Sequence, residues 1–250
     1  MSAPVLIIGG MDSSGGAGVL RDAATVAALG GDSRVAVTAV TAQSDRAVSA
    51  VHMVPPAVVA AQIITAAQGP IGAAKVGMLV TRRIVETVAE VLPDAPLVLD
   101  PVIRSSSGRT LLDSGGVRAL IATLLPRTTV LTPNLPELAA LAAQVDLAAD
   151  AAEPAIARAL LAQGCQAVLV KGGHADAGDM AEDRLYLGGG DPIRLTAPRI
   201  GIRLRGTGCF LASAIALYLA RGDSIPEAAG RAKQDMQARF VSVATAAEPG

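Results

Sequence analysis

Aromatic and cysteine residues are scarce in this 250-residue chain, which has two Tyr, two Phe and no Trp. Stacking against aromatic rings can therefore contribute little to ligand binding. The two cysteines, Cys165 and Cys209, are too far apart in sequence to form a metal-binding motif, and they indicate no disulfide framework. A signal peptide and any apolar run of about 18 residues are also missing. We therefore expect a cytoplasmic protein that does not cross a membrane.

The chain has no excess of charge of either sign, because 21 basic and 22 acidic residues leave a formal net charge of −1. There is no charge run or basic face, which argues against nucleic acid and anionic membranes as partners. Lysine is rare among the basic residues and occurs only as Lys75, Lys171 and Lys233. A compact ammonium group often meets a phosphate as a point charge. The retained lysines suggest such contacts, with chance as the alternative for Lys75 and Lys233.

Apolar residues make up 51% of the chain, and its mean hydropathy is +0.47. This content can fill a large core, and we expect residues 1–250 to form a single domain. Short apolar runs alternate with helical periods, which predicts an α/β fold with a mostly parallel sheet covered on both faces. Strands are expected at 5–8, 35–41, 47–54, 73–76, 96–99, 129–131, 167–170, 183–187, 193–197 and, strand-like, 200–204. Helices are expected at 17–29, 55–67, 81–92, 136–143, 153–163, 207–221 and 225–241, with another that follows a Ser-rich loop and ends near 125.

Polar or glycine residues follow six of the expected strands. They are 11–18, 41–43, 77–78, Asp100, Asn134 with Glu137, and 171–173. Ligands of open α/β sheets bind beyond the carboxyl ends of the strands. Turn chemistry can explain any one of these segments. Their number favours a composite active site at this edge of the sheet.

Residues 206–209 form a further candidate site, Gly206-Thr207-Gly208-Cys209, at the start of an expected helix. Two glycines let backbone N–H groups turn toward one point, and the helix adds its positive dipole end, so the segment favours an anion. A cysteine at a helix N-terminus can have a lowered pKa, which would make Cys209 a usable base or nucleophile. The alternative is that the glycines only permit a tight turn and Cys209 is a small buried hydrophobe.

Two familiar nucleotide motifs are absent. The sequence has no GxxxxGK[ST], and residues 16–21 lack the third glycine of the dinucleotide fingerprint. What remains is Asp100, the Asn134-x-x-Glu137 pair, Lys171 with two glycines, and the glycine nest of residues 206–209. Carboxylates can hold Mg²⁺ through water, Lys and amides can neutralise phosphate oxygens, and a base can accept a hydroxyl proton. These are the parts that phosphoryl transfer needs.

In this order the motifs resemble those of the hydroxymethylpyrimidine and phosphomethylpyrimidine kinases of thiamine biosynthesis, within the ribokinase-like superfamily. The resemblance rests on Asp-Ser-Ser-Gly-Gly-Ala-Gly (12–18), Thr-Ala-Gln (41–43), Val-Gly-Met-Leu (76–79), Asp-Pro-Val (100–102), Thr-Pro-Asn-Leu-Pro-Glu (132–137), Val-Lys-Gly-Gly-His (170–174) and Gly-Thr-Gly-Cys (206–209). It implies a three-layer α/β/α ribokinase-like fold and a homodimer. It also implies that ATP and Mg²⁺ are used to phosphorylate 4-amino-5-hydroxymethyl-2-methylpyrimidine, and then its monophosphate.

The resemblance also assigns roles to individual residues. Cys209 is the expected base, and the amides of Gly206, Thr207, Gly208 and Cys209 form an anion hole for the transferred phosphoryl group. Asn134 and Glu137 organise Mg²⁺ and its waters, Lys171 meets ATP phosphate, and Asp100 lies near the metal. Asp100 and Glu137 are thus the expected Mg²⁺ ligands, through water. The expected pyrimidine pocket consists of Gly10, Asp22, Gln43 and Met78.

Some of these roles have simpler alternatives. An amide such as Gln43 can pair with the ring nitrogen and amino edge of an aminopyrimidine, although a Gln at a strand end is often a backbone cap. Met78 can form a soft wall for a flat ring or can fill the core.

Two segments depart from the family pattern. Residues 103–108 read Ile-Arg-Ser-Ser-Ser-Gly where relatives usually have Met and then Lys or Thr, and Phe210 replaces the usual Thr after the catalytic Cys. The Phe210 ring either packs into the helix face or reshapes the pocket. A pyridoxal kinase of the same fold and a catalytically weakened, pyrimidine-binding paralogue are therefore the alternatives. Retention of Cys209, Lys171, Asn134 and Glu137 argues against the weakened paralogue.

Overall fold

The computed structural model describes residues 2–44, 47–105, 108–172 and 178–247. All strands named within these ranges join one sheet, in the order β3-β2-β1-β4-β5-β6-β7-β8-β9. The strands are β1 (Val5–Asp12), β2 (Ser33–Gln43), β3 (Val48–Met53), β4 (Ala73–Val76), β5 (Leu97–Leu99), β6 (Val130–Leu131), β7 (Ala167–Val170), β8 (Met180–Tyr186) and β9 (Ile193–Pro198).

The centre of the sheet is parallel, as the sequence predicts. Strands β2, β1, β4, β5, β6 and β7 run in one direction, and β3, β8 and β9 pair antiparallel at the two edges. Within the central rows, Ile7 of β1 lies between Val35 of β2 and Lys75 of β4. Parallel strands covered on both faces read as continuous apolar runs, which explains the sequence 5–8. The one charged side chain in this row, Lys75, is 1% exposed and needs a partner.

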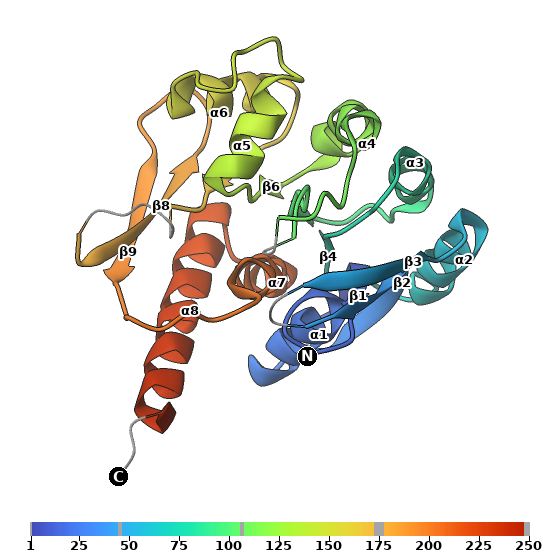
Figure 1. Cartoon of the computed structure of the whole chain (residues 1–250), viewed down its shortest axis with the longest axis horizontal. Helices are drawn as coiled ribbons and strands as arrows, with labels where there is room; N and C mark the ends of the chain where they lie inside the picture. Colours follow the sequence, from blue (N-terminus) through green and yellow to red (C-terminus); the bar gives the residue numbers. More distant parts are fainter. Residues whose placement is uncertain (1, 45–46, 106–107, 173–177, 248–250) are drawn as a thin grey trace.

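The helices cover both faces of the sheet (Figure 1). They are α1 (Gly18–Ala28), α2 (Pro56–Ala66), α3 (Arg82–Val91), α4 (Ser114–Ala119), α5 (Leu135–Ala142), α6 (Glu153–Ala162), α7 (Thr207–Ala220) and α8 (Ile225–Ala247). A π-helical turn (Leu120–Leu124) and a 3-10 turn (Leu125–Arg127) follow α4. Side-chain caps start some of them: the Thr81 hydroxyl accepts a hydrogen bond from the Ile84 amide at α3, and Asp113 accepts one from Gly116 at α4. No helix of the described ranges is long and apolar enough to cross a membrane.

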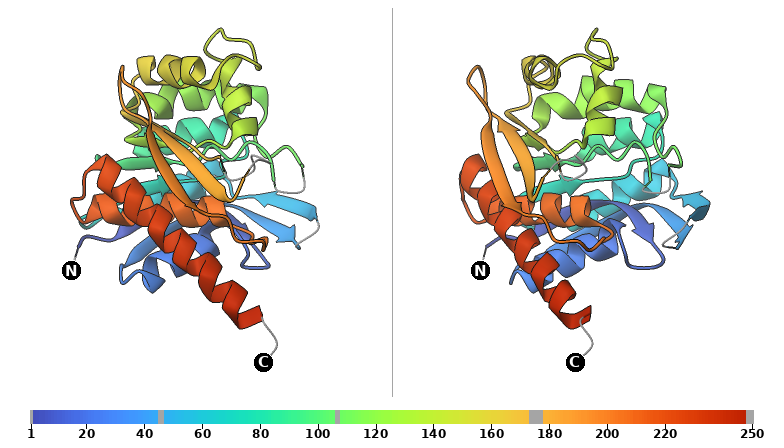
Figure 2. Two further views of the ribbon diagram at one scale, coloured as in Figure 1. Left: turned by 90° about the vertical axis from the view of Figure 1, so that its left-hand side faces the viewer. Right: turned by 60° about the vertical axis from the view of Figure 1, so that its left-hand side comes forward.

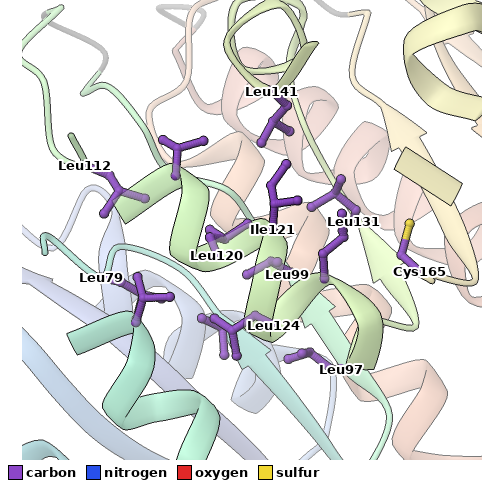
Figure 3. Packing of buried hydrophobic residues seen from close by; sticks show 14 of the residues in the cluster. Leu79, Leu97, Leu99, Leu112, Leu120, Ile121, Leu124, Leu131, Leu141 and Cys165 are labelled. Carbon is purple, nitrogen blue, oxygen red and sulfur yellow. The ribbon is translucent and has the colours of Figure 1, made fainter. Parts of the chain in front are cut away.

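Two hydrophobic cores lie on opposite faces of the sheet. Alternate side chains of β1 point to opposite faces, so Leu6 and Ile8 pack with α2 to α6 while Val5 and Ile7 pack with α1, α7 and α8. Figure 3 shows part of the first core, where Leu99 of β5 lies near Leu120 and Leu124. The expected three-layer α/β/α arrangement is therefore confirmed.

Three sequence predictions need correction. Residues 200–204 form no strand; the Ile202 amide donates to the Ile200 carbonyl, so the backbone here bonds locally rather than to a neighbouring strand. The last helix continues beyond residue 241 to Ala247, and its end projects from the body of the protein (Figure 2). The helix expected to end near 125 is divided into α4 and the two turns that follow, where Pro126 lacks the amide that a regular helix requires.

Candidate active site

The polar strand ends meet at one edge of the sheet, as expected from its parallel centre. The Ser13 hydroxyl, just after β1, donates to the Gln43 carbonyl at the end of β2, at 3.3 Å. A methyl group added at Gly10 would lie 2.5 Å from Cε of Met78, which follows β4. Farther along the edge, the Thr132 hydroxyl donates to Asp100 at 3.3 Å. These contacts connect the ends of β1, β2, β4, β5 and β6.

Lys171 is at the centre of the next group of contacts. Its Nζ lies 2.8 Å from Oδ1 of Asp100 and 3.7 Å from Oε2 of Glu137. Burial lowers the pKa of the ammonium, but the two carboxylates more than offset this, so the pKa of Lys171 lies above its ordinary value. Burial raises the pKa of Asp100, but attraction from Lys171 and Lys75 lowers it by more. The pKa of Asp100 is therefore below its ordinary value. The pair is therefore charged at neutral pH.

Asn134 and Glu137 form a reciprocal capping box at the start of α5. The Glu137 amide donates to Oδ1 of Asn134 at 2.8 Å, and the Asn134 amide donates to Oε2 of Glu137 at 2.9 Å. Burial raises the pKa of Glu137 to about 7, with attraction from Lys171 opposing the shift and the nearby Asp100 charge adding to it. Asn134 thus orients Glu137 toward Lys171 through helix geometry. Its direct contact with Mg²⁺ and its waters stays a prediction.

The glycine nest of residues 206–209 lies between Lys171 and the loop that follows β1. Gly206 has φ of 69°, and a methyl group added there would lie 2.3 Å from the Gly16 carbonyl oxygen. A methyl group added at Gly208 would lie 3.2 Å from Nζ of Lys171. Gly206 is therefore required by its positive φ and by the close Gly16 backbone, whereas Gly208 brings the nest beside the Lys171 ammonium. Thr207 is the first residue of α7.

The expected low pKa of Cys209 is wrong. Burial raises the pKa of its thiol to about 11, and Lys75 lowers it by less than burial raises it. The negative charges of Asp22 and Asp100 add to the increase, while a hydrogen bond with the Gly18 backbone reduces it slightly. Burial and the two nearby carboxylates therefore favour the neutral thiol of Cys209 at neutral pH.

Asp22, expected in the pyrimidine pocket, is buried in the protein interior. Its side chain is fully buried, with Oδ2 2.8 Å from Nζ of Lys75 and Oδ1 accepting a hydrogen bond from the Ser213 hydroxyl at 2.9 Å. The sequence suggested either a phosphate contact or chance for Lys75, and it gave Ser213 no role. The rarity of lysine was the available signal, because Lys75, Lys171 and Lys233 all form buried or nearly buried ion pairs, the last with Asp183 at 2.8 Å. Lys75 and Lys233 thus pair with carboxylates of the described chain, and the phosphate contacts suggested for them are not supported.

The other residues of the expected pyrimidine pocket lie together at the ends of β1, β2 and β4. The Gln43 amide nitrogen of the backbone donates to the Ser13 hydroxyl at 3.1 Å, and the Thr41 hydroxyl lies 3.5 Å from the side-chain oxygen of Gln43. Gln43 is half-buried, and its side chain is only weakly held by these contacts. Gly10 leaves the space that the Met78 thioether fills.

The two departures from the family pattern have different structural outcomes. Phe210 is 5% exposed and packs into the core beneath α7, with the Arg239 guanidinium 5.6 Å from the ring centre. Of the two alternatives, the structure therefore supports packing. In the loop after β5, the Ser105 amide donates to the Arg109 carbonyl, and the Arg109 guanidinium donates to the Val48 carbonyl at 2.8 Å. Ser106, Ser107, Gly173 and His174 lie outside the described residues.

Comparison with known proteins identifies the family. The family model for phosphomethylpyrimidine kinase matches residues 12–247. The chain belongs to this family. It is 43% identical to the hydroxymethylpyrimidine/phosphomethylpyrimidine kinase of Streptomyces coelicolor over 92% of this chain and 86% of that protein. It is 39% identical, over 92% of its length, to the thiamine biosynthesis bifunctional protein ThiED of Geobacter sulfurreducens, but it spans only 47% of that longer protein.

Solved structures confirm the ribokinase-like fold and include two kinds of vitamin kinase. A phosphomethylpyrimidine kinase from Clostridium difficile matches with a TM-score of 0.78 and 33% identity, covering 95% of this chain and 99% of that one. A pyridoxal kinase from Staphylococcus aureus, solved with pyridoxal, matches with a TM-score of 0.82 and 34% identity, covering 93% and 86% of the two chains. The fold alone therefore does not separate the two substrates.

Proposed function

We propose that this family member transfers a phosphoryl group from ATP to the hydroxymethyl group of 4-amino-5-hydroxymethyl-2-methylpyrimidine, and then to the resulting monophosphate. It is a phosphotransferase of thiamine biosynthesis, as its family membership and its relatives of about 40% identity indicate. The observation that carries the proposed site is the Lys171 ammonium beside Gly208 of the nest and 2.8 Å from Asp100. A cation, the backbone amides at the start of α7 and a carboxylate are the groups that stabilise charge in phosphoryl transfer.

Each group of this site has a separate task in the proposal. Lys171 and the amides of residues 206–209 stabilise negative charge on the transferred group. Cys209, as thiolate, accepts the proton of the attacking hydroxyl, which requires that its thiol lose a proton first. The Lys75 charge favours that loss.

Asp100 and Glu137 would hold Mg²⁺ through water. The residues described contain no group of three or more His, Cys, Asp or Glu that could hold a metal ion. Two carboxylates fit Mg²⁺, which keeps several waters and is commonly bound by one or two carboxylates together with substrate phosphates. When bound, the ion would neutralise charge on the phosphates. The Asp100 and Glu137 carboxylates would hold waters of the ion, and Lys171 contacts both carboxylates.

Substrate choice tests the proposal directly. ADP release is measured with Mg-ATP and hydroxymethylpyrimidine, its monophosphate, pyridoxal, pyridoxamine or ribose. We expect turnover on the two pyrimidines and little on the others, because Phe210 packs away from the site rather than reshaping the pocket. A preference for pyridoxal would favour the alternative kinase. Pyrimidine binding without turnover would favour the weakened paralogue.

Replacing Gln43 by Ala should raise KM for the pyrimidine by about tenfold and leave KM for ATP nearly unchanged. A tenfold increase in KM corresponds to about 1.4 kcal/mol of binding free energy, which is in the range for the loss of one hydrogen bond. Gln163→Ala, at the exposed end of α6, is the matched control and should change neither constant. Equal increases of both KM values in the Gln43 variant would show that Gln43 does not specifically read the pyrimidine.

We also propose that the chain acts as a cytoplasmic homodimer, where ATP is available. The support, besides the family resemblance, is a group of exposed apolar side chains on β2, β3 and α2. Val35, Met53 and Val58 are 38%, 49% and 48% exposed. Val35 and Val58 line one hollow of the surface, and exposed apolar side chains that lie together are typical of interaction surfaces. Light scattering would show twice the chain mass for a dimer, and the mass of one chain would reject it.

A further inference from the structure

Arg205 connects the two loops that meet at the active site, although neither its sequence position nor the family motif gives it a role. Its Nη2 lies 3.1 Å from Oδ2 of Asp12, the last residue of β1, and its Nη1 donates to the Ser14 hydroxyl at 3.0 Å. The Asp12 side chain is 3% exposed and that of Arg205 is 20% exposed. The ion pair is therefore largely shielded from water, where the attraction between its charges is greater than at the surface.

The backbone around this ion pair is close-packed. Oδ1 of Asp12 accepts hydrogen bonds from the amide and the hydroxyl of Ser14, at 2.9 and 2.8 Å. A methyl group added at Gly16 would lie 2.9 Å from Nη1 of Arg205, and one added at Gly206 would lie 2.3 Å from the Gly16 carbonyl oxygen. The loop after β1 thus lies directly against the first residue of the nest, and Arg205 holds the two together from the adjacent position.

We infer that Arg205 and Asp12 are positioning residues for phosphoryl transfer. This inference rests on the proposed role of residues 206–209 as the anion hole. The ion pair keeps the nest at a fixed place relative to β1, where the pyrimidine pocket begins. It also balances the negative charge of Asp12, which is buried against the residue that directly precedes the nest. Neither side chain touches the reacting atoms.

The two effects predict a specific pattern of kinetics. Arg205→Met should lower kcat by about 10- to 100-fold, because small misplacements of transition-state groups are costly, while KM for the pyrimidine changes less than about threefold. Arg205→Lys keeps the charge but not the fork of two donors, so it should recover part of kcat. The double variant Asp12→Asn with Arg205→Met removes the unpaired charge and should be more active than Arg205→Met alone.

Arg203→Met is the matched control, since Arg203 is exposed and lies two residues earlier in the same segment. It should have the kcat of the unmodified enzyme. The Tm of every variant is measured by thermal unfolding, and kcat is then measured well below the lowest Tm. A change in kcat then does not come from unfolding. The positioning role is overturned if Arg205→Met loses kcat and neither Arg205→Lys nor the double variant has a higher kcat than Arg205→Met.

Cys209→Ala in the same assay distinguishes the inference from the site on which it rests. If Cys209→Ala is impaired and Arg205→Met has full kcat, the positioning role is rejected and the site stands. If Cys209→Ala has full kcat, Cys209 is removed from the chemistry; if Arg205→Met then also has full kcat, the anion hole and the inference are rejected with it. Impairment of both, with partial recovery in Arg205→Lys and in the double variant, supports both.

Discussion

Replacing Cys209 by Ala is expected to lower kcat by about 100-fold or more, the usual cost of removing a general base. The Kd for ATP should change little, because Lys171 and the backbone amides of residues 206–209 remain. The geometry supports this separation: Cys209 lies where charges from Lys75, Asp22 and Asp100 all act on its thiol. Steady-state kinetics and equilibrium nucleotide titration measure the two quantities.

The pH dependence of kcat provides the second part of this test. The thiol has a pKa of about 11 and must be deprotonated to act as a base, so kcat of the unmodified enzyme should rise with pH above neutrality. Cys209→Ala should lose this rise. Cys165→Ala is the control, since Cys165 is buried beside α6 and its thiol donates to the Leu160 carbonyl. Full kcat in Cys209→Ala, or the same pH profile in both variants, would remove Cys209 from the chemistry.

Lys75→Met is expected to reduce the free energy of unfolding by about 3–5 kcal/mol, the cost of leaving one partner of a buried ion pair alone. Among the described residues, the Asp22 carboxylate would keep the Ser213 hydroxyl as its remaining hydrogen-bond partner, at 0% exposure. Denaturant unfolding followed by circular dichroism measures the change. kcat should fall as well, because Lys75 is the cation that favours the Cys209 thiolate.

Removing both charges separates the cost of an unpaired charge from the value of the pair. The double variant Lys75→Met with Asp22→Leu should recover most of the stability lost in Lys75→Met, because no buried charge remains. Arg82→Met breaks the exposed pair with Glu86 on α3 and should leave stability nearly unchanged. A stable Lys75→Met would mean that Asp22 is neutral or reaches another partner, and the buried network would then have no structural role.

The order of the motifs along the chain was sufficient to predict much of the site. The expected site residues come after strands of the parallel sheet: Asp100 after β5, Asn134 and Glu137 after β6, and Lys171 after β7. The ends of parallel strands meet at one edge of a sheet whatever the details of packing. The nest at the start of α7 was predictable for a related reason. Gly206 has φ of 69° and lies against the Gly16 carbonyl, as the expected tight turn before α7 requires, whereas anion binding by the nest stays a prediction.

Periodicity and local backbone preferences encode the alternation of strands and helices, the two-sided burial of β1 and the edge where the polar residues gather, so these features were predictable from the sequence. The ion pairs of Lys75 with Asp22 and of Arg205 with Asp12 depend on the folded chain, because their members are far apart in sequence. The tertiary structure also decided the pKa of Cys209 and the irregular path of residues 200–204. Ion pairs, pKa shifts and strand pairing all depend on burial and on groups distant in sequence, which no local pattern contains.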